Sequence, residues 1–442
     1  MSGPHADPVG ITRRSLLRAL GAGAGLATVA GIAGCAPSVQ PHDVNAGGGL
    51  TDDDGVETFA FTTWMMGETA SRPLVQPSLD AYQASTGVTI ETPSLPYADF
   101  LRQLVLQVQG GQTAGPVQLD ITWLSVLGTM GAALDLAPLA EGTDYTDQAL
   151  ALGRYKGRQI GLPWTSGAIG LLGNSDLLDK AGIREQPETI DDFEAALVEL
   201  KGAGQGVVPY AAMTKVAQLK DVVVWMWTFG SPVVENGRIT VGDDASVEAL
   251  TWYKKLYDTG LIGKDIDRAD ARALFGQEMV ALYDDVVSAR TLVAPNAKDP
   301  KIGDKLVAWK RPVRDAGDTP QSMAWGHAIA IIGGGPGEYA AGRFVKHVTS
   351  DPDNALDYFE RAGYPPVTET ALTDKRFTKD RFASEFATRI TETAQADPLW
   401  QFPKSAQIYE TLAQQVQAIL IGDTTPKEGL ATARERMQKL VT

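Results

Sequence analysis

Apolar positions over residues 58–123 alternate between the spacing of a strand and the spacing of an amphipathic helix. The pattern predicts five elements, in the order strand 58–64, helix ending at Gly87, strand 88–91, helix ending at Gly110 and strand 119–123. Strands that alternate with helices are typical of a parallel sheet with crossover helices. This part of the chain therefore predicts an α/β fold.

The same alternation continues further along the chain. Residues 168–172 form a short apolar run that predicts a strand, and residues 187–193 predict the start of a helix. Thr189 can cap that helix, and the two aspartates that follow Ile190 complement its dipole. A strand over residues 328–332, a glycine-rich turn and another helix come later.

The N-terminal region has a composition unlike the rest of the chain. The pair Arg13–Arg14 precedes an Ala/Gly-dominated run that is too short and too weakly hydrophobic to span a bilayer, which is typical of a twin-arginine export signal. Small residues then precede Cys35, the single cysteine, as in a bacterial lipobox. We expect residues 1–34 to be a signal peptide and Cys35 to carry a lipid. The alternative is an ordinary Ala-rich signal with a chance cysteine.

Residues 35–57 contain prolines, three successive glycines and an acidic run, with almost no large apolar residue. Such a segment cannot bury a core, so we expect a disordered tether. No later stretch approaches the roughly 20 apolar residues that a membrane helix needs. The expected location is therefore extracytoplasmic, with the lipid on Cys35 anchoring the protein to the cell membrane.

The composition excludes several classes of function. A net charge of −15 argues against nucleic acid as a partner and against adsorption to anionic lipid. The histidines fit no zinc motif, and Ser166 lacks the flanking glycines of a nucleophile elbow. We therefore expect no metal, no cofactor and no catalytic residue.

Four segments carry a family resemblance, and they occur in the order Tyr155–Trp164, Asn174–Ile183, Pro187–Phe193 and Thr425–Leu430. They are similar to the "Y-x-G-K-x-Y-G-L-P", "Y-N-K-D-L-F-E-K-A-G-L", "P-x-T-W-D-E-L" and "T/S-P-x-E-A-L" elements of extracellular solute-binding proteins (family 1, sugar or maltose-binding type). These are the receptors of ATP-binding-cassette importers. The order and spacing of the elements cover most of the chain that follows Cys35.

The resemblance implies an α/β, two-lobed periplasmic-binding-protein-like fold (type II, maltose-binding type) with several hinge crossings. Crossings in the family match positions near residues 164–166, 325–327 and 397–403. They divide the chain into an N-terminal lobe of residues 58–164 and 328–397 and a C-terminal lobe of residues 165–327 and 398–442. The implied function is capture of a mono- or oligosaccharide in the interlobe cleft by a monomer, without turnover, and its delivery to the permease subunits in the membrane.

Aromatic and polar side chains at strand ends and crossings are the candidate ligand contacts. Aromatic rings cover the C–H faces of a sugar, and carboxylates bridge its hydroxyls. Ligands of open α/β sheets bind outside the carboxyl ends of strands. The candidates are Trp64, Glu68, Trp123, Ser125, Trp164, Trp225, Asp284, Asp285, Trp325 and Tyr364. Each tryptophan has an alternative role in core or hinge packing, and each aspartate has one in an exposed loop.

Two other functions stay open from the sequence. The same fold could bind a cation such as a polyamine, caged by aromatic rings and acids. A surface-anchored glycoside hydrolase would need two carboxylates about 5–10 Å apart, and the many acids of this chain allow such a pair.

Overall fold

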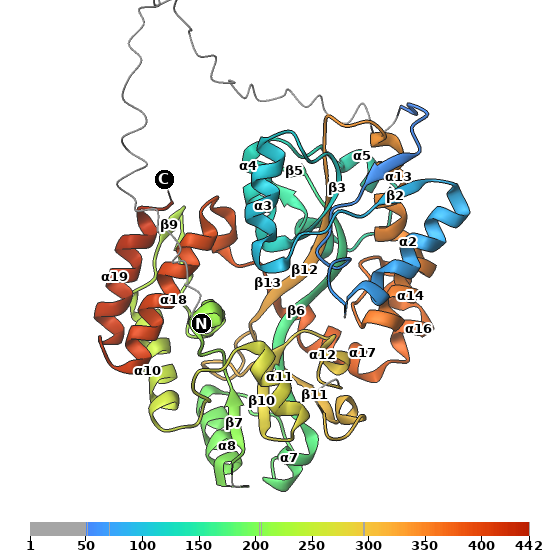
Figure 1. Cartoon of the computed structure of the whole chain (residues 1–442). Helices are drawn as coiled ribbons and strands as arrows, with labels where there is room; N and C mark the ends of the chain where they lie inside the picture. The colour runs from blue at the N-terminus through green and yellow to red at the C-terminus, as the bar shows by residue number, and fades with distance from the viewer. Residues whose placement is uncertain are drawn as a thin grey trace, which may run out of the picture. The chain divides into compact units, whose positions relative to one another are not determined.

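The computed structural model describes residues 50, 52–69, 71–202, 204, 206–294 and 297–441, which belong to the compact unit Pro41–Thr442 (Figure 1). The predicted signal peptide, Cys35 and most of the predicted tether lie outside the described residues.

Local signals set the ends of the helices as the sequence predicts. Helix α2 (Arg72–Thr86) ends at Gly87, whose φ of 78° is a left-handed conformation that glycine adopts without strain. Helix α8 (Ile190–Gly202) begins beside a reciprocal cap. The hydroxyl of Thr189 accepts the backbone N–H of Asp192 at 3.2 Å, and a carboxylate oxygen of Asp192 accepts the backbone N–H of Thr189 at 3.2 Å.

Two long antiparallel strands, β6 (Leu162–Asn174) and β12 (Ser322–Ile332), organise a seven-stranded mixed sheet. The other strands of this sheet are β3 (Gly115–Asp120), β7 (Val208–Ala211), β10 (Val280–Asp285), β11 (Leu306–Trp309) and β13 (Ala394–Gln395). Strands β10 and β11 run antiparallel to the far end of β6, and β3 runs antiparallel to β12. The expected parallel pairing is present between β1 (Thr58–Ala60) and β2 (Thr89–Glu91), but the large sheet is mixed.

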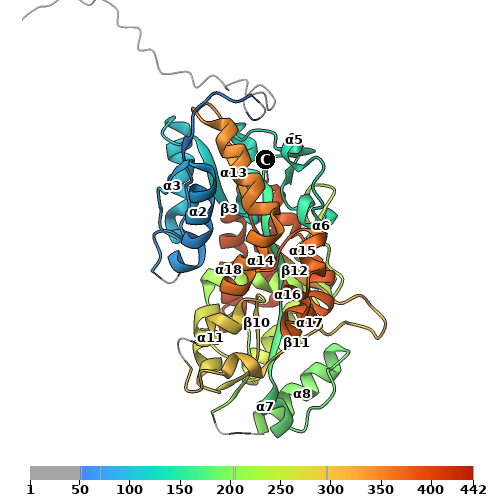
Figure 2. The same cartoon turned by 90° about the vertical axis from the view of Figure 1, so that its right-hand side faces the viewer.

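The first core lies around one end of the two long strands. It contains apolar residues of β3, of α2 and of three further helices, α3 (Tyr97–Gln109), α13 (Glu338–Ser350) and part of α14 (Pro352–Ala362). Figure 2 shows α13 between α2 and α5 (Ala137–Ala140). Trp164 of β6 belongs to this core, whereas Ala168 and Leu171 of the same strand belong to the other two.

The second and third cores lie around the other end of β6. The second is built largely from α8, α9 (Val223–Thr228), α10 (Asp244–Asp258), α18 (Ser405–Ile421) and α19 (Pro426–Gln438). The third contains residues of α11 (Arg268–Gly276), α14, α15 (Glu369–Thr373), α16 (Lys375–Thr378) and α17 (Arg381–Arg389).

Helices α15, α16 and α17, which lie within the residues 328–397 expected in the N-terminal lobe, pack into the third core. These helices share the third core with β10 and β11. Gly170 of β6 leaves space for the side chain of Ile390 at the end of α17: a Cβ on this glycine would lie 2.2 Å from Ile390. The lobe boundaries themselves stay a prediction.

The last residues of the predicted tether make specific contacts with α13. Leu50 is buried in the first core. A carboxylate oxygen of Asp54 accepts the backbone N–H of Gly337 at 2.8 Å, and Glu57 pairs with Arg343 at 2.8 Å. This end of the segment is therefore attached to the fold, unlike our expectation for residues 35–57.

The remaining described elements are short. They are η1 (Ile121–Trp123), α4 (Leu124–Met130), α6 (Asp147–Ala151), β4 (Arg154–Tyr155), β5 (Arg158–Gln159), α7 (Ser175–Lys180), η2 (Val216–Val222), β8 (Val234–Glu235), β9 (Arg238–Ile239), α12 (Ala289–Leu292), η4 (Ile302–Lys305), η5 (Thr391–Thr393) and η6 (Pro398–Gln401). Among the helices in the described ranges, none has the length and apolar character that crossing a membrane requires.

Candidate functional site

The end of β10 places two acids on opposite faces of the sheet, because successive residues of a strand point in opposite directions. Asp284 accepts hydrogen bonds from the hydroxyl of Tyr210 and from Nη2 of Arg311, the latter at 2.5 Å. The two oxygens of Asp285 accept Nε and Nη2 of Arg272 at 2.7 and 2.6 Å. Both carboxylates are thus engaged within the protein, so the sequence-based expectation that one of them contacts ligand directly is not supported by the geometry.

Helix α11 supplies two arginines that the sequence analysis missed. Arg268 and Arg272 stand four residues apart, so they lie on one face of the helix. Arg268 pairs with Asp221, and its Nε donates to the backbone oxygen of Asp284 at 3.3 Å. Burial alone would lower the pKa of Arg268, but the charges of Asp221 and Asp285 raise it, so the guanidinium stays charged. The helical spacing of the two arginines was the signal that could have identified them.

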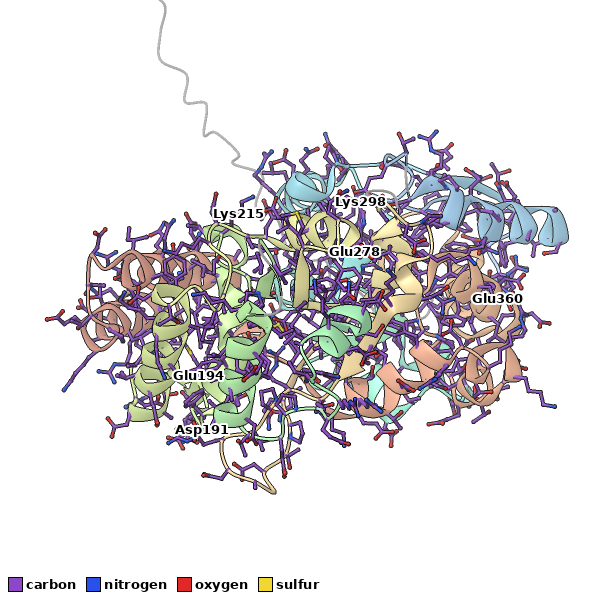
Figure 3. All side chains as sticks on the ribbon, turned by 90° about the horizontal axis from the view of Figure 1, so that it is seen from below. Asp191, Glu194, Lys215, Glu278, Lys298 and Glu360 are labelled. Atoms are coloured by element: carbon purple, nitrogen blue, oxygen red, sulfur yellow. The ribbon has the colours of Figure 1, made fainter. Side chains whose placement is uncertain are left out.

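The start of α11 is fixed by a second set of charges. Asp267 and Asp270 form a capping box at its N-terminus. Lys215, labelled in Figure 3, lies 2.5 Å from Asp270 and 3.3 Å from Asp267. Because its first turn is held in this way, α11 presents Arg268 and Arg272 from a defined position.

Aromatic and acidic residues of the first core's elements lie within electrostatic reach of these arginines. The hydroxyl of Tyr97 donates to Asp120 at 3.2 Å. The charge of Asp120 raises the pKa of Tyr97, to which Glu68 also contributes, while Arg268 lowers it. The charges of Glu68 and Arg268 therefore both act on the hydroxyl of Tyr97, although the three residues come from different parts of the chain.

The strand β12 and the loop after α14 add a group of rings. Trp325 lies 4.9 Å from His327 and 5.4 Å from Tyr364, measured between ring centroids. Burial raises the pKa of Tyr364, Arg272 lowers it, and Asp285 and Glu68 raise it. Both Trp325 and Tyr364 keep part of their surface exposed. We call the set Glu68, Tyr97, Asp120, Arg268, Arg272, Trp325 and Tyr364 the polar cluster.

Three of the candidate tryptophans lie in cores rather than on an open surface. Trp64 is only 5% exposed, and its ring meets Tyr97, Phe100, Trp123 and His327 at near-perpendicular angles. Trp164 stacks on Tyr358 at 5.0 Å. Trp225 is buried in the second core beneath the guanidinium of Arg311, 4.5 Å from its ring. For these three the packing alternative fits the structure, because neighbouring rings close over each indole.

Trp123 and Ser125 border two hollows on either side of α4. Trp123 stacks on Phe100 and lines a pocket of about 760 Å³ with Tyr97, Pro403 and Lys404. Ser125 lines a pocket of about 530 Å³ between α4 and η6. Its buried hydroxyl has no hydrogen-bond partner among the described residues. The structure thus places Trp325 and Tyr364 together and Trp123 and Ser125 at neighbouring hollows, whereas Glu68 accepts the hydroxyl of Ser71.

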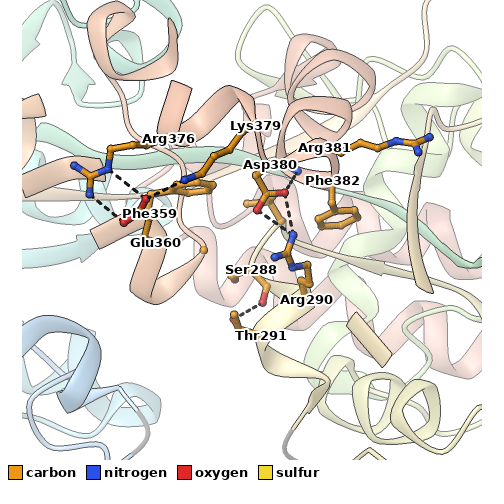
Figure 4. Close-up of a pocket in the computed structure, with 13 residues that line it drawn as sticks. Ser288, Arg290, Thr291, Phe359, Glu360, Arg376, Lys379, Asp380, Arg381 and Phe382 are labelled. Carbon is orange, nitrogen blue, oxygen red and sulfur yellow. Dashed lines mark hydrogen bonds and ion pairs between the residues drawn. The ribbon is translucent and has the colours of Figure 1, made fainter. Parts of the chain in front are cut away.

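Another pocket, of about 440 Å³, contains none of the predicted residues (Figure 4). Its charged walls are paired with one another: Arg290 lies 3.0 Å from Asp380, and Arg376 lies 3.1 Å from Glu360. This pocket joins α12 to α14, α16 and α17, and the aromatic residues that line it are Phe359 and Phe382 (Figure 4). Across the described residues, no group of three or more His, Cys, Asp or Glu side chains is arranged to hold a metal ion.

Comparison with known proteins identifies the class. Residues 78–383 match the family of bacterial extracellular solute-binding proteins, and the chain belongs to that family. Among curated relatives, the lipoprotein LipO of Bacillus subtilis is 28% identical over 218 residues, or 44% of this chain and 43% of that protein. A Deinococcus radiodurans protein named "Probable ABC transporter-binding protein" is 28% identical over 195 residues, or 41% of this chain and 46% of that protein. The chain spans about half the length of the curated relatives it matches.

Solved structures show that the fold is the two-lobed one of maltose-binding type. The GacH receptor of Streptomyces glaucescens, solved unliganded and with acarbose, gives a TM-score of 0.76 at 20% identity, covering 87% of this chain and 98% of that one. The maltose-bound MalE3 of T. maritima gives 0.76 at 19% identity, covering 87% and 99%. The predictions of family and fold class are therefore confirmed.

Proposed function

We propose that this protein captures an uncharged carbohydrate between its two lobes and delivers it, unaltered, to the permease of an ATP-binding-cassette importer. The observation that carries the proposal is the polar cluster. It combines tyrosine and tryptophan rings with two arginines whose charges are already matched by internal aspartates. Aromatic rings together with arginines whose charges are compensated suit a ligand that has flat C–H faces and neutral hydroxyls.

The paired state of the acids favours a neutral ligand over a cation. A polyamine site would need carboxylates whose oxygens are free to face the ligand. Asp284 and Asp285 are instead bound by arginines, and one oxygen of Glu68 accepts the hydroxyl of Ser71 at 2.6 Å. The carboxylate of Asp120 accepts hydrogen bonds from the hydroxyl of Tyr97 and from the backbone N–H of Thr122. A cation would compete with each of these partners.

The family of the chain and its structural neighbours support the proposed role in transport, the absence of turnover and the lipid anchor. The family consists of solute-binding proteins rather than enzymes, several of its structural neighbours are described as binding maltose or related saccharides, and one curated relative is named a lipoprotein. We propose that twin-arginine export and a lipid on Cys35 hold this protein at the outer face of the cell membrane, where it works as a monomer.

Titration calorimetry on the mature protein tests the proposal. Glucose, galactose, maltose and maltotriose are titrated in parallel with spermidine, at about 20 and 300 mM salt. We expect stoichiometric heat from at least one saccharide, with an affinity that salt hardly changes and no new product by chromatography. Spermidine binding that weakens as salt rises would replace the proposal with a polyamine receptor. Release of shortened saccharides would replace it with a hydrolase.

A further inference from the structure

Asp285 is fully occupied inside the protein. Its two oxygens hold Nε and Nη2 of Arg272 in a bidentate pair at 2.7 and 2.6 Å, and Oδ1 also accepts the backbone N–H of Val286 at 2.8 Å. The side chain has no exposed surface. Asp285 therefore cannot touch a ligand in this arrangement, but it fixes the plane of the Arg272 guanidinium.

Arg268 is fixed one turn earlier on the same helix. Its Nη2 pairs with Asp221, and its Nε donates to the backbone oxygen of Asp284. Its own backbone N–H donates to Gln218 at 2.7 Å. The two guanidinium groups are thus positioned before any ligand arrives, which lowers the entropy lost on binding.

Each guanidinium keeps unused donors. An arginine has five N–H groups. In the described part of the chain, Nη1 of Arg268 and Nη1 of Arg272 make no hydrogen bond. The side chains are 15% and 24% exposed, so these donors are accessible. The charge of Arg268 acts on Tyr97 and the charge of Arg272 acts on Tyr364, in each case opposing the rise in the pKa of the hydroxyl.

We propose that Nη1 of Arg268 and Nη1 of Arg272 donate hydrogen bonds to hydroxyl oxygens of the saccharide, and that Asp221 and Asp285 are positioning residues that also select against anionic ligands. The selection follows from charge. Each arginine already faces an aspartate, and Asp120 and Glu68 add further negative charge that acts on Tyr97. A carboxylate on the ligand would meet no net positive charge, whereas a hydroxyl needs only the donor.

This inference rests on the proposed function, and the experiment separates the two. Thermal shift and calorimetry use glucose, galactose, maltose and maltotriose as neutral probes, with glucuronic and galacturonic acids as anionic probes. The variants are Arg272→Lys, Asp285→Asn and the double variant Arg272→Gln with Asp285→Asn. The control is Arg290→Lys, which alters an arginine–aspartate pair in the pocket of Figure 4, where Nη1 of Arg290 donates to both oxygens of Asp380 at 3.0 Å.

Arg272→Lys should raise the Kd of the neutral saccharide that binds wild type by about tenfold, equivalent to about 1.4 kcal/mol. The single ammonium group of lysine cannot make the two parallel hydrogen bonds to Asp285 and also place a donor where Nη1 of Arg272 lies. Asp285→Asn should give measurable binding of a uronic acid that wild type rejects. Arg290→Lys should leave every Kd within about twofold. The double variant keeps a neutral hydrogen-bonded pair, so it preserves the fold if the single variants unfold, and it should lose neutral binding as Arg272→Lys does.

Unchanged neutral binding in Arg272→Lys, or in the double variant, would overturn the inference while leaving the proposed function intact. So would wild-type binding of a uronic acid as tight as that of its neutral parent. Wild type that binds none of the saccharides would instead count against the proposed function, and the donor assignment would then fall with it.

Discussion

Replacing Trp64 with alanine separates the packing role of this indole from a role in ligand contact. Its ring is almost completely buried and meets four other rings within 5.1–5.5 Å. A tryptophan buries about 150–250 Å², which at about 25 cal/mol per Å² corresponds to about 4–6 kcal/mol. Large-to-small changes of this kind cost about 3–5 kcal/mol in other cores. We expect Trp64→Ala to lose about 4 kcal/mol of unfolding free energy.

Urea unfolding monitored by circular dichroism measures this loss. Trp123→Ala is the matched comparison, because Trp123 stacks on Phe100 but also borders an open pocket. It should lose only about 1–2 kcal/mol of stability, yet it should weaken saccharide binding by more than about 1 kcal/mol. If Trp64→Ala unfolds at the wild-type midpoint and slope while losing its ligand, the burial argument is wrong and Trp64 belongs to the site.

Three further predictions concern other parts of the chain. Burial lowers the pKa of His327 to about 4 from 6.5. Below pH 6.5 the unfolded chain therefore binds a proton that the folded chain does not. The free energy of unfolding should fall by about 3 kcal/mol between pH 6.5 and 4. Urea unfolding across this pH range should show a smaller fall in the free energy of unfolding for His327→Gln than for wild type. Gly170→Ala should lower the melting temperature, at a cost of about 1–3 kcal/mol, because a Cβ there would overlap Ile390. Cys35→Ala should move the protein from the membrane fraction to the soluble fraction, because a lipid-free chain has no anchor.

Each of these three has a result that would contradict it. Identical pH profiles for wild type and His327→Gln would show that the imidazole does not resist protonation in the folded state. A Gly170→Ala variant as stable as wild type would show that α17 can move away from β6. Retention of Cys35→Ala at the membrane would remove the lipid from the proposed mode of attachment.

Much of the fold was predictable because its signals are local. Gly87 ends α2, and Thr189 caps α8, from contacts within a few residues. The pairing of the sheet was not predictable in the same way. Whether β3 runs parallel or antiparallel to β12 depends on partners more than 200 residues away, and alternation along one strand carries no information about direction.

The candidate site was predictable only in part. The sequence analysis selected Trp325 and Tyr364, which do lie together, and Asp284 and Asp285, which are bound by arginines. A carboxylate looks the same in a sequence whether it faces a ligand or a buried cation. Its role was decided by α11, whose register with β10 brings Arg272 to Asp285 and which no short motif marks.

The shared strands limit how the molecule can change in length. In β6, Trp164 packs in the first core, and Ala168 and Leu171 pack in the other two. The packing at both ends of this stretch therefore fixes the face of the sheet on which each residue between Trp164 and Ala168 lies. Inserting one residue there would turn each downstream side chain to the opposite face. The pairing of β12 with β6 already contains one register shift, between His327 and Ala328. Insertions and deletions should therefore be tolerated freely in surface turns, whereas the part of β6 between the first core and the other two cores should tolerate them only two residues at a time.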